Sequence, residues 1–389
     1  MSDTGQRNRT GRTGPGVGRR TVLKAGAAAA GAVAAGPLAV VSRRARAADR
    51  LRVLAWPGYE ERAIAEEFED THGVRLEFKV YIGGEQMLRS FNRAPRGTYD
   101  TVLVDAEYVR RLAAMDAIEP YSPGEIPELA NYHPRFRTMR QVRAGGGRIW
   151  GTATRFGFYA ISYNADRMSR AASGDWNSLF LPELAGRIGV LDWYLPNMGI
   201  ASLAVHPGKQ NPYDLSDEQL GAVRAWLLRL RPQVGMLGAS SRPIVQAMID
   251  GDIVAAMVGD LDIDLKLAGY PNFEATIPKQ GGIRWQEVAT VCKQSRNKDL
   301  ALEWIRYVSQ AHVQAKLCFA KAFKARGPNL KVADHWTAEQ NRLMGYDPDP
   351  ANRGRMRVES LIDRSVGRDL PVRQEAKAWI DIFNEFRVG

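Results

Sequence analysis

The fold class is decided by residues 50–80, RLRVLAWPGYEERAIAEEFEDTHGVRLEFKV. A short β-type run around Leu51 and Val53 comes first, and a helical pattern with one apolar face follows over 61–72. From Val74 to Val80 every second residue is apolar, which is the pattern of a half-buried strand. A strand, a helix and a strand in this order indicate an α/β fold with a parallel sheet covered by helices.

The same alternation continues along the chain. A helix over 85–92, a strand over 101–104 and a helix over 107–115 complete a βαβαβ unit, and an extended segment over 149–164 leads to a second α/β unit. The 341 residues after residue 48 exceed what one hydrophobic core usually organises, so two domains are expected. The later expected elements are the strands 188–191 and 253–258, the apolar run 288–291, and the helices 243–250, 299–309 and 373–387.

Residues 1–48 have the order of an export leader. A basic start that includes Arg19 and Arg20 precedes the apolar stretch Ala25–Val41, and Ala45-Arg46-Ala47 is a small-x-small cleavage site. The arginine pair, followed by an apolar residue, Leu23 and Lys24, indicates the twin-arginine route and a periplasmic protein. The alternative is a permanent membrane anchor, but the apolar stretch is shorter than the roughly 20 residues that span a bilayer.

The charge distribution argues against a nucleic-acid-binding protein, and the cysteine content argues against a disulfide-rich or zinc-binding one. Residues 1–48 contain nine Lys and Arg and one Asp, so they supply +8 of the formal charge of +11. The remaining charge of +3 lacks the basic footprint of a nucleic-acid-binding protein. The only cysteines, Cys292 and Cys318, are too few for a disulfide framework or a zinc site, and either pair or remain separate buried thiols.

Enzyme and metal motifs are absent from the sequence. It has no nucleophile elbow, phosphate loop, dinucleotide fingerprint or paired-histidine helix. The acidic run from Asp260 to Asp264 resembles a calcium loop, but Leu265 and Pro271 replace its required Gly and closing Glu. We therefore expect no metal and no cofactor, and place these carboxylates either at a helix start or, for Asp260 and Asp262, facing a cleft.

Aromatic and acidic residues recur directly after the expected strands. Ligands of parallel sheets bind beyond the carboxyl ends of the strands. Aromatic faces attract ammonium groups by about 0.5–2 kcal/mol each, and a carboxylate compensates a charge that loses its water. One such aromatic alone is more often a core residue, so the prediction of a cationic-amine site rests on their recurrence. The candidate ligand-binding residues are Trp56, Tyr59, Asp105, Glu107, Asp192, Trp193, Asp260, Trp285 and Glu287.

Five sequence blocks in fixed order resemble the spermidine/putrescine-binding periplasmic proteins. The resemblance runs from Asp49 to about Asn329. Each block is weak alone, and together their order and spacing are specific. The blocks are LAWPGY at 54–59, YDTV at 99–102, WNSLFLPELAGR at 176–187, PKQGG at 278–282 with Trp285 behind it, and GPN at 327–329.

The resemblance implies a type II periplasmic-binding-protein fold, with two α/β lobes joined by crossing hinge strands and closing on a solute. It implies a lobe 1 made of residues 49–156 and 286–333. Lobe 2 then consists of residues 157–285 and 334–389.

Residue by residue, the resemblance is incomplete. Trp56 and Tyr59 match the aromatic pair of the first lobe, and Trp285 matches the aromatic before the carboxylate that holds the amine. Glu287 replaces the Asp of that carboxylate, and Gly259 replaces an aromatic wall. Other departures are Glu107 and Ala325 in place of tyrosines, and Trp193 and Pro196 where a second acidic pair is expected beside Asp192.

The resemblance thus implies a monomeric receptor of an ABC importer that delivers a solute to a permease and ATPase and catalyses nothing. The solute is a polyamine such as putrescine or spermidine, or else an opine, an amino-acid derivative or another nitrogenous solute. Arg284 and Arg326 are candidates to meet an anionic group of such a solute. Rival hypotheses are an exported hydrolase that uses Asp192 with Glu287 as a carboxylate pair, and a sensor subunit that reports the solute to a membrane receptor.

Overall fold

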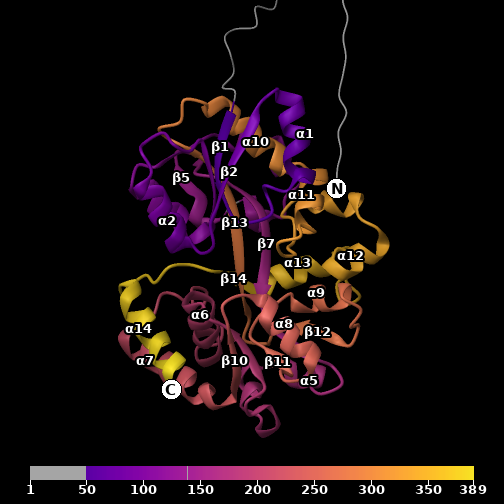
Figure 1. Ribbon diagram of the computed structural model, residues 1–389. Helices are drawn as coiled ribbons and strands as arrows, with labels where there is room; N and C mark the ends of the chain where they lie inside the picture. The colour runs from indigo at the N-terminus through magenta and orange to yellow at the C-terminus, as the bar shows by residue number, and fades with distance from the viewer. Residues whose placement is uncertain (1–49, 138) are drawn as a thin grey trace, which may run out of the picture. The chain divides into compact units, whose positions relative to one another are not determined.

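Two β-sheets organise the computed structural model, which describes residues 50–137 and 139–389 (Figure 1). The export leader predicted over 1–48 lies outside the described residues. No helix within the described ranges has both the length and the apolar character needed to cross a membrane.

The first sheet contains the expected βαβαβ unit. β1 pairs in parallel with β2 and with β3, so the carboxyl ends of β1 and β3 lie at the same edge of the sheet. The long strand β13 pairs antiparallel with β3 and closes the sheet toward β14. The strands of this sheet are β1 (Arg50–Ala55), β2 (Arg75–Val80), β3 (Thr101–Asp105), β4 (Ile118–Glu119), β7 (Thr152–Tyr159), β13 (Gly282–Cys292) and β14 (Ser365–Gly367).

The second sheet has the strand order β10-β9-β11-β8-β12. β9 is parallel to both of its neighbours, whereas β8 is antiparallel to β11 and to β12. Its strands are β8 (Ile161–Asn164), β9 (Ile188–Leu191), β10 (Val234–Gly238), β11 (Ala255–Ala256) and β12 (Phe273–Thr276), and a separate ribbon joins β5 (Arg143–Gly145) to β6 (Arg148–Ile149).

Helices cover the two sheets as separate layers with separate cores. The apolar face of α1, with Ile64 and Phe68, packs in the first core, and Trp379 and Phe383 of α14 pack in the second. The α-helices are α1 (Arg62–His72), α2 (Gly84–Arg93), α3 (Ala106–Ala114), α4 (Pro134–Arg137), α5 (Arg170–Ser173), α6 (Tyr194–Val205), α7 (Asp217–Leu230), α8 (Ser241–Asp250), α9 (Leu261–Leu267), α10 (Lys298–Ser309), α11 (Ala311–Cys318), α12 (Ala338–Met344), α13 (Arg357–Asp363) and α14 (Ala376–Val388). The short 3-10 helices are η1 (Pro123–Glu125), η2 (Pro127–Asn131), η3 (Arg140–Val142), η4 (Trp176–Phe180), η5 (Pro182–Leu184), η6 (Arg231–Gln233) and η7 (Leu330–His335).

Two long strands carry the chain between the lobes. β7 and β13 pair antiparallel along most of their length. Tyr159 and Ile283 face each other in this ladder and pack in the second core, whereas Phe156 and Val288 pack in the first. Both strands therefore pass from one lobe into the other (Figure 1), which confirms the expected arrangement of two α/β lobes joined by crossing strands.

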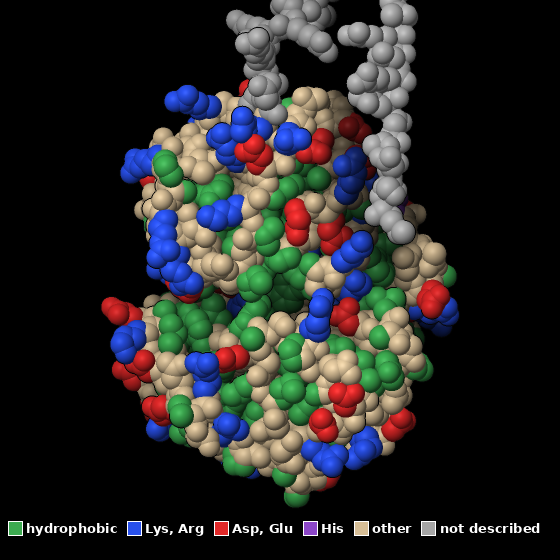
Figure 2. All heavy atoms as spheres, viewed as in Figure 1, with side chains coloured by type: hydrophobic (Ala, Val, Ile, Leu, Met, Phe, Trp, Pro, Cys, Tyr) green, Lys and Arg blue, Asp and Glu red, His purple; other side chains and the backbone are tan. Residues whose placement is uncertain are grey.

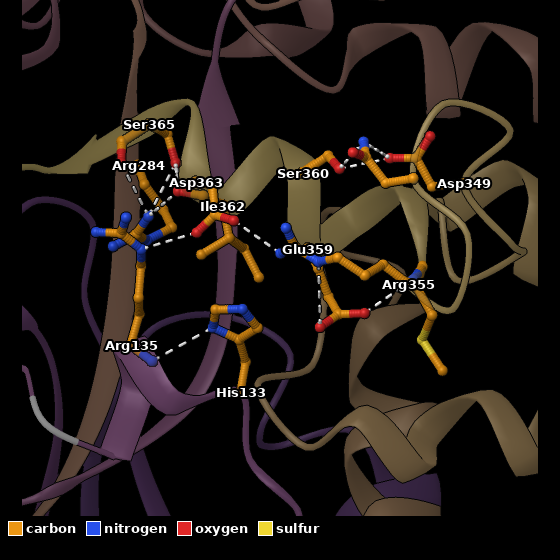
Figure 3. A network of polar contacts seen from close by, with 12 residues as sticks. His133, Arg135, Arg284, Asp349, Arg355, Glu359, Ser360, Ile362, Asp363 and Ser365 are labelled. Carbon is orange, nitrogen blue, oxygen red and sulfur yellow. Dashed lines mark hydrogen bonds and ion pairs between the residues drawn. The ribbon is translucent and has the colours of Figure 1, made fainter.

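A third connection follows α13 and β14, and Figure 3 shows how it is fastened. Nη1 of Arg284, on β13, donates to the carbonyl oxygen of Ile362 at 3.0 Å and to Oγ of Ser365 at 2.8 Å. Oδ1 of Asp363 accepts from Nε of Arg135 at 3.2 Å. These bonds hold the end of α13 against β13 and the first lobe before the chain continues to α14.

The packing also bears on how the chain divides between the lobes. Val358 and Ile362 of α13 belong to the first core, whereas Trp379 belongs to the second. We therefore propose that residues 334–363 go with the first lobe, although the sequence placed all of 334–389 in the second.

Several elements differ from the sequence expectation. The strand expected over 253–258 is only the two-residue β11, and the helix expected from residue 373 begins at Ala376. α6 was not predicted because every residue from Leu195 to Ala204 is buried, so the helix has no polar face to reveal its period. α7 was also missed, although Ser216 and Gln219 form a capping box at its start.

Cys292 and Cys318 are both buried and do not form a disulfide with each other. The interpretation as two separate thiols is confirmed.

Gly259 lies against the crossing strand β7. A Cβ atom at this position would come within 2.0 Å of the carbonyl oxygen of Phe158, which is backbone and cannot move aside. The aromatic wall that the resemblance implies at this place cannot be built on this backbone.

We predict that Gly259→Ala destabilises the protein by about 1–3 kcal/mol, because overpacking displaces β7. The matched control is Gly221→Ala in α7, where an added Cβ meets nothing within 4 Å. That change should stabilise by about 0.5–1 kcal/mol, since alanine is the better helix former. Urea unfolding of both variants measures the two changes in the free energy of unfolding. Equal changes would contradict the predicted clash at Gly259.

Candidate functional site

Two cavities lie where the lobes face each other. The larger, which we call the aromatic compartment, has a volume of about 600 Å³ and is walled by Phe158, Tyr159, Trp285 and Phe323. The smaller, the side compartment, has a volume of about 410 Å³ and lies against Tyr108 and other residues of both lobes. In Figure 2 the surface is hollowed between the lobes, and hydrophobic side chains gather around the recess. Cavities of this size hold small molecules.

Two tryptophans from opposite lobes meet between the compartments. Trp56 follows β1 and Trp193 follows β9, and both side chains line both cavities. Their ring centroids are 6.0 Å apart with the planes tilted by 41°. Nε1 of Trp56 is buried and has no hydrogen-bond partner among the described residues. An indole nitrogen only donates, so this group lacks an acceptor.

The structure brings eight of the nine predicted site residues to the two cavities. Tyr59 is the exception, because it is fully buried and lines neither. Lining the aromatic compartment are Trp56, Asp105, Trp193, Asp260, Trp285 and Glu287, and lining the side compartment are Trp56, Asp105, Glu107, Asp192 and Trp193.

Glu287, predicted to receive an amine, already has a cationic partner. Its Oε2 accepts from Nε of Arg155 at 2.7 Å and from the hydroxyl of Tyr59 at 2.8 Å. Arg155 lies opposite Glu287 in the ladder of β7 and β13, and both side chains are almost completely buried. Burial raises the pKa of Glu287, although the charge of Arg155 opposes the rise. Tyr59 thus supports this carboxylate from behind the cavity wall.

Asp105 and Glu107 share a single arginine. Arg368, from the third connection between the lobes, bonds Oδ2 of Asp105 at 3.0 Å and Oε1 of Glu107 at 2.7 Å. It also donates to the hydroxyl of Tyr159 at 3.0 Å. This buried group carries two acids against one base, and Glu107 Oε2 has no partner. Burial raises the pKa of Asp105 to about 6 and that of Glu107 to about 7, against the opposing charge of Arg368.

Asp260 is committed to the fold rather than free for a ligand. Its Oδ2 accepts from the backbone N–H of Phe158 at 2.7 Å, and its Oδ1 pairs with Arg326. Its backbone is left-handed, with a φ of 65°. Such a conformation is unfavourable for a residue other than glycine, so the two bonds hold it in place.

Asp192 has a more exposed partner. Its Oδ1 and Oδ2 accept from Nε of Arg387 at 2.8 Å and from Nη2 at 2.9 Å. The carboxylates that the sequence proposed for an amine therefore all have arginine partners in this structure.

Six further residues of the aromatic compartment that carry charged or aromatic side chains were missed. Arg368 lies too far along the chain to be connected with strands β3 and β7. Phe323 and Lys324 lie in an irregular segment that gives no periodic signal. Asp264 is the last residue of the acidic run that was compared with a calcium loop. Its spacing of four residues from Asp260 places both on one helix face, and this spacing could have indicated that Asp264 also faces the cavity. These missed residues are Phe158, Tyr159, Asp264, Phe323, Lys324 and Arg368.

Neither arginine suggested for an anionic group lines a cavity. Arg284 is engaged with α13 and β14, and Arg326 with Asp260 and the carbonyl oxygen of Met344. Within residues 50–137 and 139–389, no cluster of three or more His, Cys, Asp or Glu side chains is arranged to hold a metal ion.

Comparison with known proteins identifies related sequences and folds. Residues 63–344 match the family model described as bacterial extracellular solute-binding protein. The chain is similar to the putrescine-binding periplasmic protein PotF of Escherichia coli (strain K12), at 23% identity over 359 residues that cover 86% of this chain and 93% of PotF.

Two solved structures have the same fold. The spermidine/putrescine ABC transporter substrate-binding protein PotD of Streptococcus pneumoniae superposes with a TM-score of 0.68 at 16% identity, covering 87% of this chain and 98% of PotD. MotA of A. tumefaciens B6, solved in complex with glucopine, gives a TM-score of 0.65 at 15% identity, covering 87% of this chain and 99% of MotA. The fold is therefore the two-lobed type II periplasmic-binding-protein fold that the sequence predicted.

The raised pKa values of the two carboxylates that share Arg368 predict that the stability of the protein depends on pH. The pKa values of Asp105 and Glu107 lie above those of the unfolded chain, so between about pH 4 and 7 the folded protein binds more protons than the unfolded one. This group therefore lowers the free energy of unfolding as pH rises through that window. Glu107→Gln should remove part of that loss and stabilise the protein at pH 7.5 by about 2 kcal/mol.

The measurement is urea unfolding of wild type and Glu107→Gln from pH 5 to 8. Glu183→Gln, at an exposed position in η5, is the control and should leave the pH slope unchanged. A Glu107→Gln variant that loses stability at pH 7.5 would show that the second carboxylate is needed by Arg368.

Proposed function

Because the chain belongs to the bacterial extracellular solute-binding proteins, we propose that its aromatic compartment binds a small ammonium-bearing solute and presents it to the permease and ATPase of an ABC importer. The observation that carries this proposal is a cavity of about 600 Å³ between the lobes, with aromatic walls from both. Aromatic faces hold desolvated ammonium groups and the methylene groups attached to them. The names of PotF and PotD, which refer to putrescine and spermidine, support an amine as part of the solute.

The electrostatics favour a solute with one ammonium group over a linear polyamine. A polyamine with two or three charges needs as many uncommitted carboxylates, since a buried charge without a partner is strongly unfavourable. Among the described residues that line the aromatic compartment, only Asp264 has a carboxylate without a hydrogen-bond or ion-pair partner. An opine, an amino-acid derivative or a similar nitrogenous solute fits this arrangement, and MotA with glucopine is an example within the same fold.

A binding role is also better supported than hydrolysis. The proposed catalytic pair, Asp192 and Glu287, line different compartments and each has an arginine partner. We propose that the protein catalyses no reaction and acts as a monomer, and that the reporting of solute to a membrane sensor is a less supported use of the same fold.

Thermal shift with a panel of primary amines, amino acids and opines tests the proposal. A ligand at 100 times its Kd adds about 2.7 kcal/mol to the stability of the folded protein. Asp264→Asn should weaken the binding of any active compound by about tenfold to a hundredfold, because a hydrogen bond between charged groups is lost.

The matched control for this variant is Asp252→Asn, at an exposed position that lines neither cavity. It should bind as wild type does. If no amine-bearing compound shifts the transition, the proposal is wrong.

We further propose that residues 1–48 direct export through the twin-arginine route to the periplasm. Replacing Arg19 and Arg20 together by lysine keeps the charge and removes the arginine pair that this route requires, so the protein should accumulate in the cytoplasm. Replacing Arg7 and Arg9 by lysine is the control and should leave export intact. Immunoblots of periplasmic and cytoplasmic fractions measure the outcome, and unchanged export of the Arg19 and Arg20 variant would indicate the general secretory route.

A further inference from the structure

The charged side chains around the aromatic compartment fall into two groups. Asp105, Glu287, Asp260 and Arg368 are held in the ion pairs described above. Asp264 and Lys324 are not. Both line the compartment, both are half-buried, and neither has an ion-pair partner among the described residues.

The two uncommitted charges have opposite sign. Nζ of Lys324 donates to the carbonyl oxygen of Ala320 at 2.8 Å, which leaves two of its three protons without a partner. Burial raises the pKa of Asp264, and the charge of Lys324 opposes that rise. The two side chains therefore affect each other through space without joining in an ion pair. A solute that carries both charges can be placed between them.

Neutral groups that line the same compartment from both lobes can also donate hydrogen bonds. Ser240 and Ser241 line the compartment at the start of α8, and Ser240 makes no side-chain cap bond there. The first N–H groups of a helix favour an anion. The buried Nε1 of Trp56 is a second and independent donor without an acceptor.

We propose that the solute is a zwitterion, with its ammonium group at Asp264 and its carboxylate at Lys324, assisted by the start of α8. This inference rests on the proposed function and specifies the chemical class of the ligand. A solute with one charge of each sign leaves no unpaired charge in the closed cavity. A diamine of equal length would leave one ammonium group facing Lys324, which like-charge repulsion and desolvation both disfavour.

Three matched sets of compounds test this inference by isothermal titration calorimetry. They are 1,3-diaminopropane, 3-aminopropanoate and 3-aminopropanamide; putrescine, 4-aminobutyrate and 4-aminobutanamide; and cadaverine, 5-aminopentanoate and 5-aminopentanamide. Within each set the backbone is constant and only the charge at one end changes. In the set whose length fits best, the zwitterion should bind at least about tenfold more tightly than the other two.

Variants at Lys324 assign the preference to that residue. Lys324→Met should weaken binding of the zwitterion by about tenfold to a hundredfold and leave the amide within about twofold of wild type. Lys324→Arg should retain much of the preference. Lys321→Met, an exposed lysine three residues earlier that does not line the cavity, is the control and should change nothing.

The outcomes separate this inference from the proposed function. If a diamine or an amide binds as tightly as its zwitterion or more tightly, the zwitterion inference is wrong while amine binding stands. A preference for the zwitterion that survives Lys324→Met also contradicts it. If no member of any set binds, the zwitterion inference is wrong, whereas the proposed function fails only if the whole thermal-shift panel gives no ligand.

Discussion

The antiparallel pairing of β7 with β13 is the constraint on which the rest of the molecule depends. It carries the chain between the two cores and sets Arg155 directly opposite Glu287. The same ladder places Gly157 opposite Trp285, where a Cβ atom would come within 2.6 Å of the indole ring. One register thus joins the lobes, pairs a buried carboxylate with an arginine and packs the cavity-lining Trp285 against the backbone of β7. A shift by one residue would turn each of these side chains to the other face.

Arginines pair with three of the four carboxylates that line the aromatic compartment among the described residues. Glu287, Asp260 and Asp105 pair with Arg155, Arg326 and Arg368, respectively, and only Asp264 lacks such a partner among the described residues that line this cavity. Buried pairs of this kind add little to stability, since desolvation offsets much of their attraction. Under the proposed function their effect is on selectivity, because a solute with several positive charges finds few uncommitted carboxylates in the cavity. Two proteins with the same fold and similar aromatic walls can therefore differ in ligand through residues that lie behind the wall.

Local patterns made the architecture predictable, and distant pairings limited the prediction of the site. The alternation of strand-like and helix-like hydrophobic periods over 50–115 predicted the elements from β1 to α3, because a hydrophobic period depends only on a few neighbouring residues. The position of aromatic residues near the ends of expected strands then identified Trp56, Trp193 and Trp285 as lining residues. The partners of the carboxylates were out of reach, since Arg155 lies 132 residues before Glu287 and Arg368 lies 261 residues after Glu107. Nothing local to an arginine indicates which strand will face it.

The two cysteines have a consequence for the chemistry of the protein's surroundings. Cys292 ends β13 and Cys318 ends α11, and burial raises the pKa of both thiols, aided at Cys292 by the charge of Asp100. Thiol exchange and oxidation proceed through an accessible thiolate, which neither residue offers. Both thiols are therefore shielded from peroxide and from glutathione disulfide for as long as the fold around them stays intact.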